Sequence, residues 1–243
     1  MHANVDDWNR AAEHVCQDVL SACGYEAGVV DALQLARKLG YSVIFDELQA
    51  TRGRLKRIGH KTSIFLKPDT RPERIQWALS HEIGESLAYR VFQTLELAPP
   101  SESMGLREQV ANLLATRLLL PSRDFLSTAL HCHSDIQALK RIYWTASHEL
   151  IALRLLDLPR RACVTIVDQG RVTKRRASTP SQPGPWTTLE QNCWQETHRG
   201  ARFQESCSEQ VHIRCWPIHE PHWKREILLT TLPLSWETEP GYD

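Results

Sequence analysis

The segment over residues 72–95 constrains the fold more than any other part of the sequence. It is predicted to form one long helix, because a proline is tolerated in the first helical turn and Glu73 suits a helix N-terminus. The letters HEIGE in its middle place His81 and Glu85 four residues apart, so that both side chains project from one face of the helix. Glu82 points to the side of that pair. A tetrahedral catalytic zinc site takes three protein ligands, so a third ligand has to come from another element.

The segments before this helix alternate between helical and extended patterns. Apolar residues recur at helical spacing over residues 8–24, and a short amphipathic helix that ends at Gly40 leads into a strand over residues 41–45. Residues 52–68 are predicted to form a hairpin that turns near Gly59. The sequence therefore predicts the α+β class, with helices packed against a small β-sheet.

The predicted elements fall into three parts. Residues 1–125 form a core that includes a helix ending at Pro121. Residues 126–160 form a helical extension, in which two short apolar-spaced segments resemble a helix-turn-helix pair. Residues 161–243 form a β-rich C-terminal region of unknown role, with a hairpin around Gly170.

Two motifs follow one another on the long helix and on the helix after it. The first is His-Glu-x-x-Glu, beginning at His81, and the second is Glu-x-x-Ala-Asn, beginning at Glu108 and followed by a leucine-rich run that ends at Pro121. This pair resembles the ImmA/IrrE family of metallopeptidases, the family of the IrrE N-terminal-like domain, whose first motif is His-Glu-x-x-His. The resemblance covers roughly residues 28–160 and implies a gluzincin-like metallopeptidase core within residues 1–125.

The resemblance also implies a role for each motif residue. His81, Glu85 and Glu108 are the expected ligands of a Zn²⁺ ion, and Glu82 is the expected general base that activates water for attack on a peptide carbonyl. Family members cut helix-turn-helix repressors of mobile elements or stress genes. The implied function is therefore a metal-dependent endopeptidase with a protein substrate of that class, acting in stress response or transcription regulation.

Glu85 stands where the family has its second zinc histidine. A glutamate oxygen ligates zinc at ~2.0–2.2 Å, so geometry does not forbid the exchange. Two ionised carboxylates, Glu85 and Glu108, would neutralise the dication and weaken its Lewis acidity. Oxygen ligands also weaken the selection for zinc over Mn²⁺ or another divalent ion. A slower enzyme with relaxed metal choice and a site that holds no metal both stay open.

Composition bears on partners and location. The 29 basic and 29 acidic residues cancel, so nucleic acid is not an expected partner, and the would-be recognition helix carries Glu149 and Asp157 against phosphate. No apolar stretch approaches the ~20 residues of a membrane span, and the polar start lacks a signal-peptide core, so we expect a cytoplasmic protein without membrane contact. The seven cysteines form no CxxC pair and are expected to be free thiols.

Other functions compete with the peptidase. The main alternative is a catalytically inactive peptidase-like protein that acts as a protein-binding or regulatory module. A DNA-binding regulator would have to use residues 134–158, which are poor in basic side chains. The histidines His219 and His222 offer further metal ligands, but they lack a complete metal spacing and are predicted to be surface polar residues. The sequence does not indicate an oligomeric state.

Overall fold

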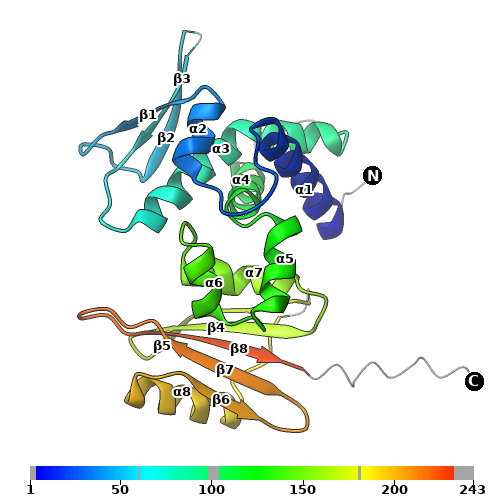
Figure 1. The fold of residues 1–243 in the computed structure, drawn as a ribbon, viewed down its shortest axis with the longest axis vertical. Helices are drawn as coiled ribbons and strands as arrows, with labels where there is room; N and C mark the ends of the chain where they lie inside the picture. The colour runs from blue at the N-terminus through cyan, green and yellow to red at the C-terminus, as the bar shows by residue number, and fades with distance from the viewer. Residues whose placement is uncertain (1–3, 60, 98–103, 180–181, 233–243) are drawn as a thin grey trace, which may run out of the picture. The chain divides into compact units, whose positions relative to one another are not determined.

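The protein is described by a computed structural model over residues 4–59, 61–97, 104–179 and 182–232 (Figure 1). The chain divides into two compact units, one made of Met1–His131 and Lys140–Ser147 and the other of Cys132–Leu139 and His148–Asp243. The three-part division expected from the sequence stays a prediction. No helix in the described part of the chain is long and apolar enough to cross a membrane.

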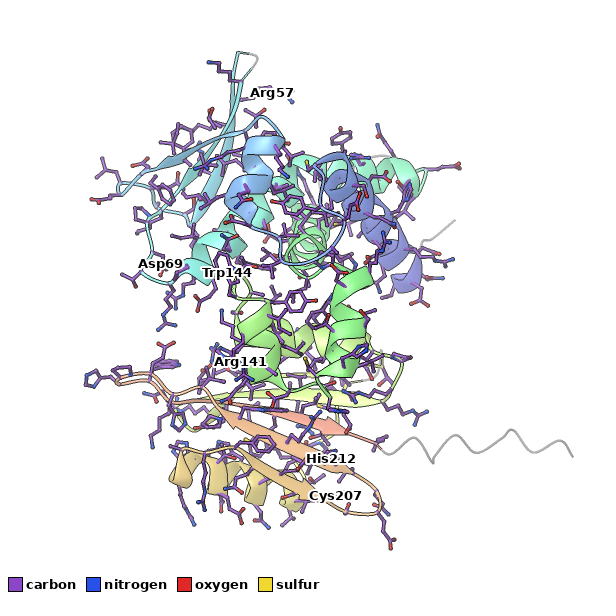
Figure 2. All side chains as sticks on the ribbon, in the orientation of Figure 1. Arg57, Asp69, Arg141, Trp144, Cys207 and His212 are labelled. Atoms are coloured by element: carbon purple, nitrogen blue, oxygen red, sulfur yellow. The ribbon has the colours of Figure 1, made fainter. Side chains whose placement is uncertain are left out.

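The first unit packs helices against one small sheet. Its elements are α1 (Val5–Ala22), α2 (Ala32–Lys38), β1 (Ser42–Phe45), β2 (Gly53–Ile58), β3 (Lys61–Leu66), α3 (Pro72–Thr94), α4 (Met104–Leu119) and α5 (Ser122–His131). The strand order is β1-β3-β2, with β1 parallel and β2 antiparallel to the central strand. Ile64 and Leu66 of β3 are fully buried, so this sheet contributes directly to the core. Arg57 lies exposed near the tip of the hairpin (Figure 2).

The second unit is built on an antiparallel sheet. Its elements include α7 (His148–Arg154), the 3-10 helix η1 (Leu155–Asp157), β4 (Ala162–Asp168), β5 (Arg171–Ala177), α8 (Thr188–Gly200), β6 (Gln204–Cys207), β7 (His212–Pro217) and β8 (Arg225–Thr231). The strand order is β5-β4-β8-β7-β6. Side chains alternate along β8, so that Glu226 and Thr230 contact α8 while Arg225 contacts Glu149 of α7.

The structure confirms the α+β class, with a helical core followed by a β-rich C-terminal region. The two short helices predicted within residues 134–158 are α6 (Ile136–Ile142) and α7. Two helices were not predicted from the sequence. Helix α5 starts directly after Pro121, and α8 lies in the region predicted to hold strands. Thr187 and Glu190 form a capping box at the start of α8. The S/T-x-x-E pattern that they make is a recognised sequence signal of a helix N-terminus.

Candidate metal centre

Three side chains meet where α3 and α4 pack together. His81 and Glu85 come from successive turns of α3, and Glu108 comes from the first half of α4. One ligand atom from each lies within 4.8 Å of the other two. His81 Nε2 is 3.4 Å from Glu108 Oε2. Two ligands of a tetrahedral zinc ion lie roughly 3.3–3.6 Å apart, given bond lengths of ~2.0–2.2 Å, so this pair is spaced for one ion.

Close packing of the two helices brings Glu108 to His81. A Cβ atom at Gly84 would lie 2.6 Å from the carbonyl oxygen of Ala111, which is closer than non-bonded atoms approach. Gly84 is therefore needed for α4 to pass this near to α3. The glycine inside HEIGE thus belongs to the helix packing that assembles the site.

Asn112 fixes the orientation of the histidine ring. Its Nδ2 group donates a hydrogen bond to Glu108 Oε1 at 3.1 Å, because an ionised carboxylate can only accept. Its Oδ1 atom then faces His81 Nδ1 at 3.2 Å and must accept from it. In a neutral imidazole this contact places the proton on Nδ1 and leaves the lone pair of Nε2, which faces Glu108, for a metal ion. Such outer contacts orient the ligands of metal sites. The sequence places Asn112 at the end of the second motif but does not predict a role for it.

Arg107 contacts the residue that replaces the second histidine. Its Nε group lies 2.7 Å from Glu85 Oε2, and the pair joins the start of α4 to α3. The Arg107 side chain is 58% exposed, so water screens this ion pair. A carboxylate has about four lone-pair positions, so Glu85 keeps acceptor capacity beside Arg107. The structure thus gives Glu85 a cationic partner that the sequence did not predict.

Glu82 lies beside the three converging residues but is more buried than they are. Burial is the largest influence and raises its pKa, while His81 and a hydrogen bond from the Leu55 backbone lower it, and the net pKa lies above the usual range. A Cβ atom at Gly53 would lie 2.6 Å from Glu82 Oε1, so the glycine at the start of β2 makes room for the carboxylate. A raised pKa suits a general base that works near neutral pH.

A cleft of about 650 Å³ opens over this constellation. Its walls are the metal-centre side chains, the loop before β2, and β2 itself, including Arg54 and Lys56. Strand β2 is paired only with β3 within the described residues, so its other side is an unpaired strand edge. Such an edge can add an extended peptide as a further strand. Water, a carbonyl group and a carboxylate base could therefore meet in this cleft.

Comparison with known proteins places this arrangement in a family. The family model of the IrrE N-terminal-like domain, a peptidase family, matches residues 36–156. A solved structure of a Mycobacterium tuberculosis transcriptional regulator is similar in fold, with a TM-score of 0.64 and 19% sequence identity over 94% of this chain and 76% of that chain. No curated protein matches. The chain therefore belongs to the IrrE N-terminal-like domain family, with Glu85 in place of the second histidine of the family motif.

Proposed function

We propose that the chain is a metal-dependent endopeptidase of the ImmA/IrrE type. The observation that carries this proposal is the convergence of His81, Glu85 and Glu108 beside a buried Glu82 at the floor of an open cleft. One imidazole and two carboxylates suit a divalent ion, either Zn²⁺ or Mn²⁺, because oxygen ligands weaken the preference for zinc. An ion held by these three residues would supply Lewis acidity, polarising a peptide carbonyl and favouring attack by water at neutral pH.

The roles of the protein groups follow from their positions. Glu82 takes a proton from the attacking water and returns a proton to the amine that leaves. The Asn112 contacts hold His81 and Glu108 in one geometry. The edge of β2 aligns the substrate in an extended conformation above Glu82, which favours an unfolded or loop segment of a protein as substrate. A helix-turn-helix repressor in the cytoplasm is the substrate class that the family resemblance implies.

Metal content tests the site. The protein is purified without chelator, incubated with Zn²⁺ or Mn²⁺, desalted and measured by mass spectrometry beside His81→Ala. We expect the variant to hold about one equivalent less than the wild type, because it loses its only nitrogen ligand. Equal metal content in both proteins overturns the ligand set. In the same assay Glu85→His should raise zinc content at limiting zinc, since imidazole binds zinc more selectively than a carboxylate.

Cleavage tests the chemistry. A mixture of unstructured peptides is incubated with the metal-loaded protein, and new termini are read by mass spectrometry. We expect cleavage by the wild type and strongly reduced cleavage by Glu82→Gln, which keeps the ligands and loses the base. A wild type that binds metal through His81 but cuts no peptide overturns the peptidase proposal.

One observation favours a second function, an inactive peptidase-like module that binds a protein partner. The ion pair between Arg107 and Glu85 satisfies the altered ligand residue without a metal. In this function the cleft and the edge of β2 would still bind an extended segment. Metal content that is insensitive to His81→Ala, together with binding of unstructured peptides that are released uncut, supports it.

A further inference from the structure

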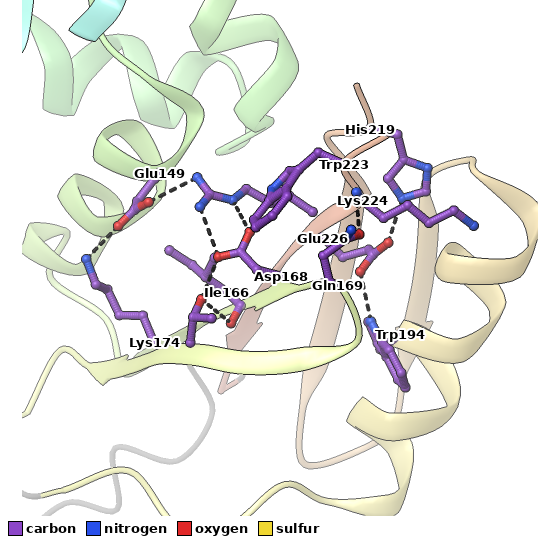
Figure 3. A network of polar contacts seen from close by, with 12 residues as sticks. Glu149, Ile166, Asp168, Gln169, Lys174, Trp194, His219, Trp223, Lys224 and Glu226 are labelled. Atoms are coloured by element: carbon purple, nitrogen blue, oxygen red, sulfur yellow. Dashed lines mark hydrogen bonds and ion pairs between the residues drawn. The ribbon is translucent and has the colours of Figure 1, made fainter. Parts of the chain in front are cut away.

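A second histidine and glutamate cluster lies in the second unit. Glu226 of β8 is fully buried, and one of its oxygens, Oε1, faces two imidazoles. His219 Nε2 lies 2.5 Å from this oxygen, and His198 Nδ1 lies 2.9 Å from it. The other oxygen, Oε2, accepts a hydrogen bond from Trp194 Nε1 at 3.0 Å (Figure 3). One nitrogen or oxygen atom from each of the three residues therefore lies within 4.8 Å of the others.

Three separate elements hold this cluster in place. Trp194 and His198 are four residues apart on α8, so they share the face that packs on the sheet. Alternation along β8 turns Glu226 toward that face. His219 follows the end of β7, and the backbone of the preceding Ile218 donates a 2.7 Å hydrogen bond to Arg225 of β8. The sheet register thus fixes His219 next to Glu226, and the helix brings His198 to them.

The buried negative charge of Glu226 would be stabilised by a nearby cation. Removing a carboxylate from water costs several kcal/mol unless a positive charge compensates it. Among the described residues, no lysine or arginine forms an ion pair with Glu226, whose partners are the two imidazoles and the indole. By contrast Glu190 of α8, which is also buried, forms an ion pair with Arg175. A divalent ion bound by two neutral imidazoles and one carboxylate would supply the positive charge.

The ligand set and its access also fit a metal. Two histidines and one glutamate form an established zinc set that leaves a fourth position for water. The His198 and His219 side chains are 30% and 18% exposed, so an ion can enter from solvent although the carboxylate is buried. Zinc would need each nitrogen roughly 3.3–3.6 Å from Oε1, so the His219 ring would move outward by about 1 Å and the His198 ring by about 0.5 Å. The hydrogen bond from Trp194 would orient the carboxylate, as outer contacts do in metal sites.

We propose that His198, His219 and Glu226 form a divalent-metal site that prefers zinc and is independent of the centre between α3 and α4. The preference follows from the ligands, since two imidazoles favour zinc over Mn²⁺ or Mg²⁺. The ion would tie α8 to strand β8 and the loop after β7. This proposal does not rest on the peptidase function.

The test uses the full chain with His81→Ala and Glu108→Ala, which removes the first centre, and Zn²⁺ or Co²⁺ as the probe. In this background we add His198→Asn or His219→Gln. Each amide can still donate to Glu226 from nearly the same position, so the buried carboxylate stays hydrogen-bonded and the fold is preserved. His212→Gln is the matched control, because His212 contacts a single, exposed Glu205 at 2.5 Å in the same unit (Figure 2).

We expect about one equivalent of zinc in the background protein, the visible absorption of four-coordinate Co²⁺, and a melting temperature that rises with zinc. His198→Asn and His219→Gln should weaken zinc binding by more than the about 10–100-fold that loss of an outer contact causes, and His212→Gln should change nothing. A background protein that binds no zinc overturns the site. So does zinc binding that survives either histidine substitution in a folded variant, as judged by circular dichroism.

Discussion

The two histidine and glutamate clusters differ in charge and in burial. The centre between α3 and α4 has one histidine and two glutamates, with Glu108 exposed and Glu85 paired to Arg107. The cluster of the second unit has two histidines and a single buried Glu226. Two carboxylates with a competing arginine favour a weakly held, less selective ion, while two imidazoles favour zinc. We therefore expect the second cluster to prefer zinc over Mn²⁺. We expect the metal affinity of the first centre to show less preference between these ions and to depend on the charge of Arg107.

The largest expected effect is a loss of peptide cleavage at the first centre without a loss of metal. Glu82→Gln should lower peptide cleavage by about 10²–10⁴-fold, since it removes a general base, while metal content stays at the wild-type level. Cleavage rates and metal analysis on the same preparation check this. The His198→Asn variant serves as the comparison, because it changes the metal content of the other unit and should leave cleavage unchanged. Equal cleavage by Glu82→Gln and the wild type contradicts the assignment of the base.

The next prediction compares two buried glutamates whose pKa values shift in opposite directions. Glu190 is 1% exposed, and its oxygens contact Arg175 at 3.1 Å each. Burial alone would raise its pKa, but the hydrogen bonds from Arg175, Thr187 and Thr230 outweigh burial and hold the pKa below the usual range. A lowered folded-state pKa stabilises the protein above the unfolded-state pKa, and this stability is lost as the pH falls through the folded-state pKa.

Glu190→Gln should therefore lower the free energy of unfolding at pH 7 by about 3–5 kcal/mol, because Arg175 loses the partner of a buried pair. The difference from the wild type should shrink below pH 4.5, as the wild-type carboxyl becomes protonated. Urea unfolding at pH 7 and at acidic pH measures both values. Glu82→Gln is the contrasting variant, since the raised pKa of Glu82 gives no such stability at neutral pH. A pH-independent difference for Glu190→Gln would contradict the ion-pair explanation.

The residues that we propose as ligands of the first centre could be named from the sequence because they lie in two contiguous motifs. Helical periodicity alone puts His81 and Glu85 on one face, and the family resemblance supplies Glu108. It did not predict the contact between Arg107 and Glu85, since that depends on how two helices are rotated against each other. The contact of Gly84 with the backbone of α4 was not predicted either, because it depends on the same rotation of the two helices.

The second cluster had no comparable signal. His219 lies seven residues before Glu226, but the two face each other only through the register of β7 and β8. His198 joins them only through the packing of α8, which was not predicted. His219 was expected to be a surface polar residue, whereas its side chain is 18% exposed and contacts Glu226. The capping box at Thr187 and Glu190 would have indicated the helix, but strand register is set by tertiary packing that one sequence does not display.

A smaller effect tests whether the two clusters are independent. Trp194→Phe removes the indole hydrogen bond to Glu226 and should weaken zinc binding at the second cluster by about 10–100-fold. Binding at the first centre should not change. Trp186→Phe is the matched control, because Trp186 packs against Trp194 at 5.7 Å between ring centroids and its indole nitrogen has no hydrogen-bond partner among the residues that the structure describes. Equal zinc affinity in both variants would show that the indole does not orient Glu226.

The smallest effect concerns the residue that distinguishes the first centre. A metal ion at Glu85 has to share the carboxylate with Arg107, and the guanidinium also repels a dication. The ion pair is exposed and worth at most about 1 kcal/mol, so Arg107→Gln should raise the affinity for Mn²⁺ by about two- to fivefold in a His219→Gln background. Arg90→Gln removes the same charge from α3, where Arg90 pairs with Asp18 at 3.2 Å, and should have less effect. Titration calorimetry with Mn²⁺ measures both. Unchanged affinity in Arg107→Gln would mean that Arg107 does not compete with the ion, and a loss would mean that Arg107 holds Glu85 in its ligating position.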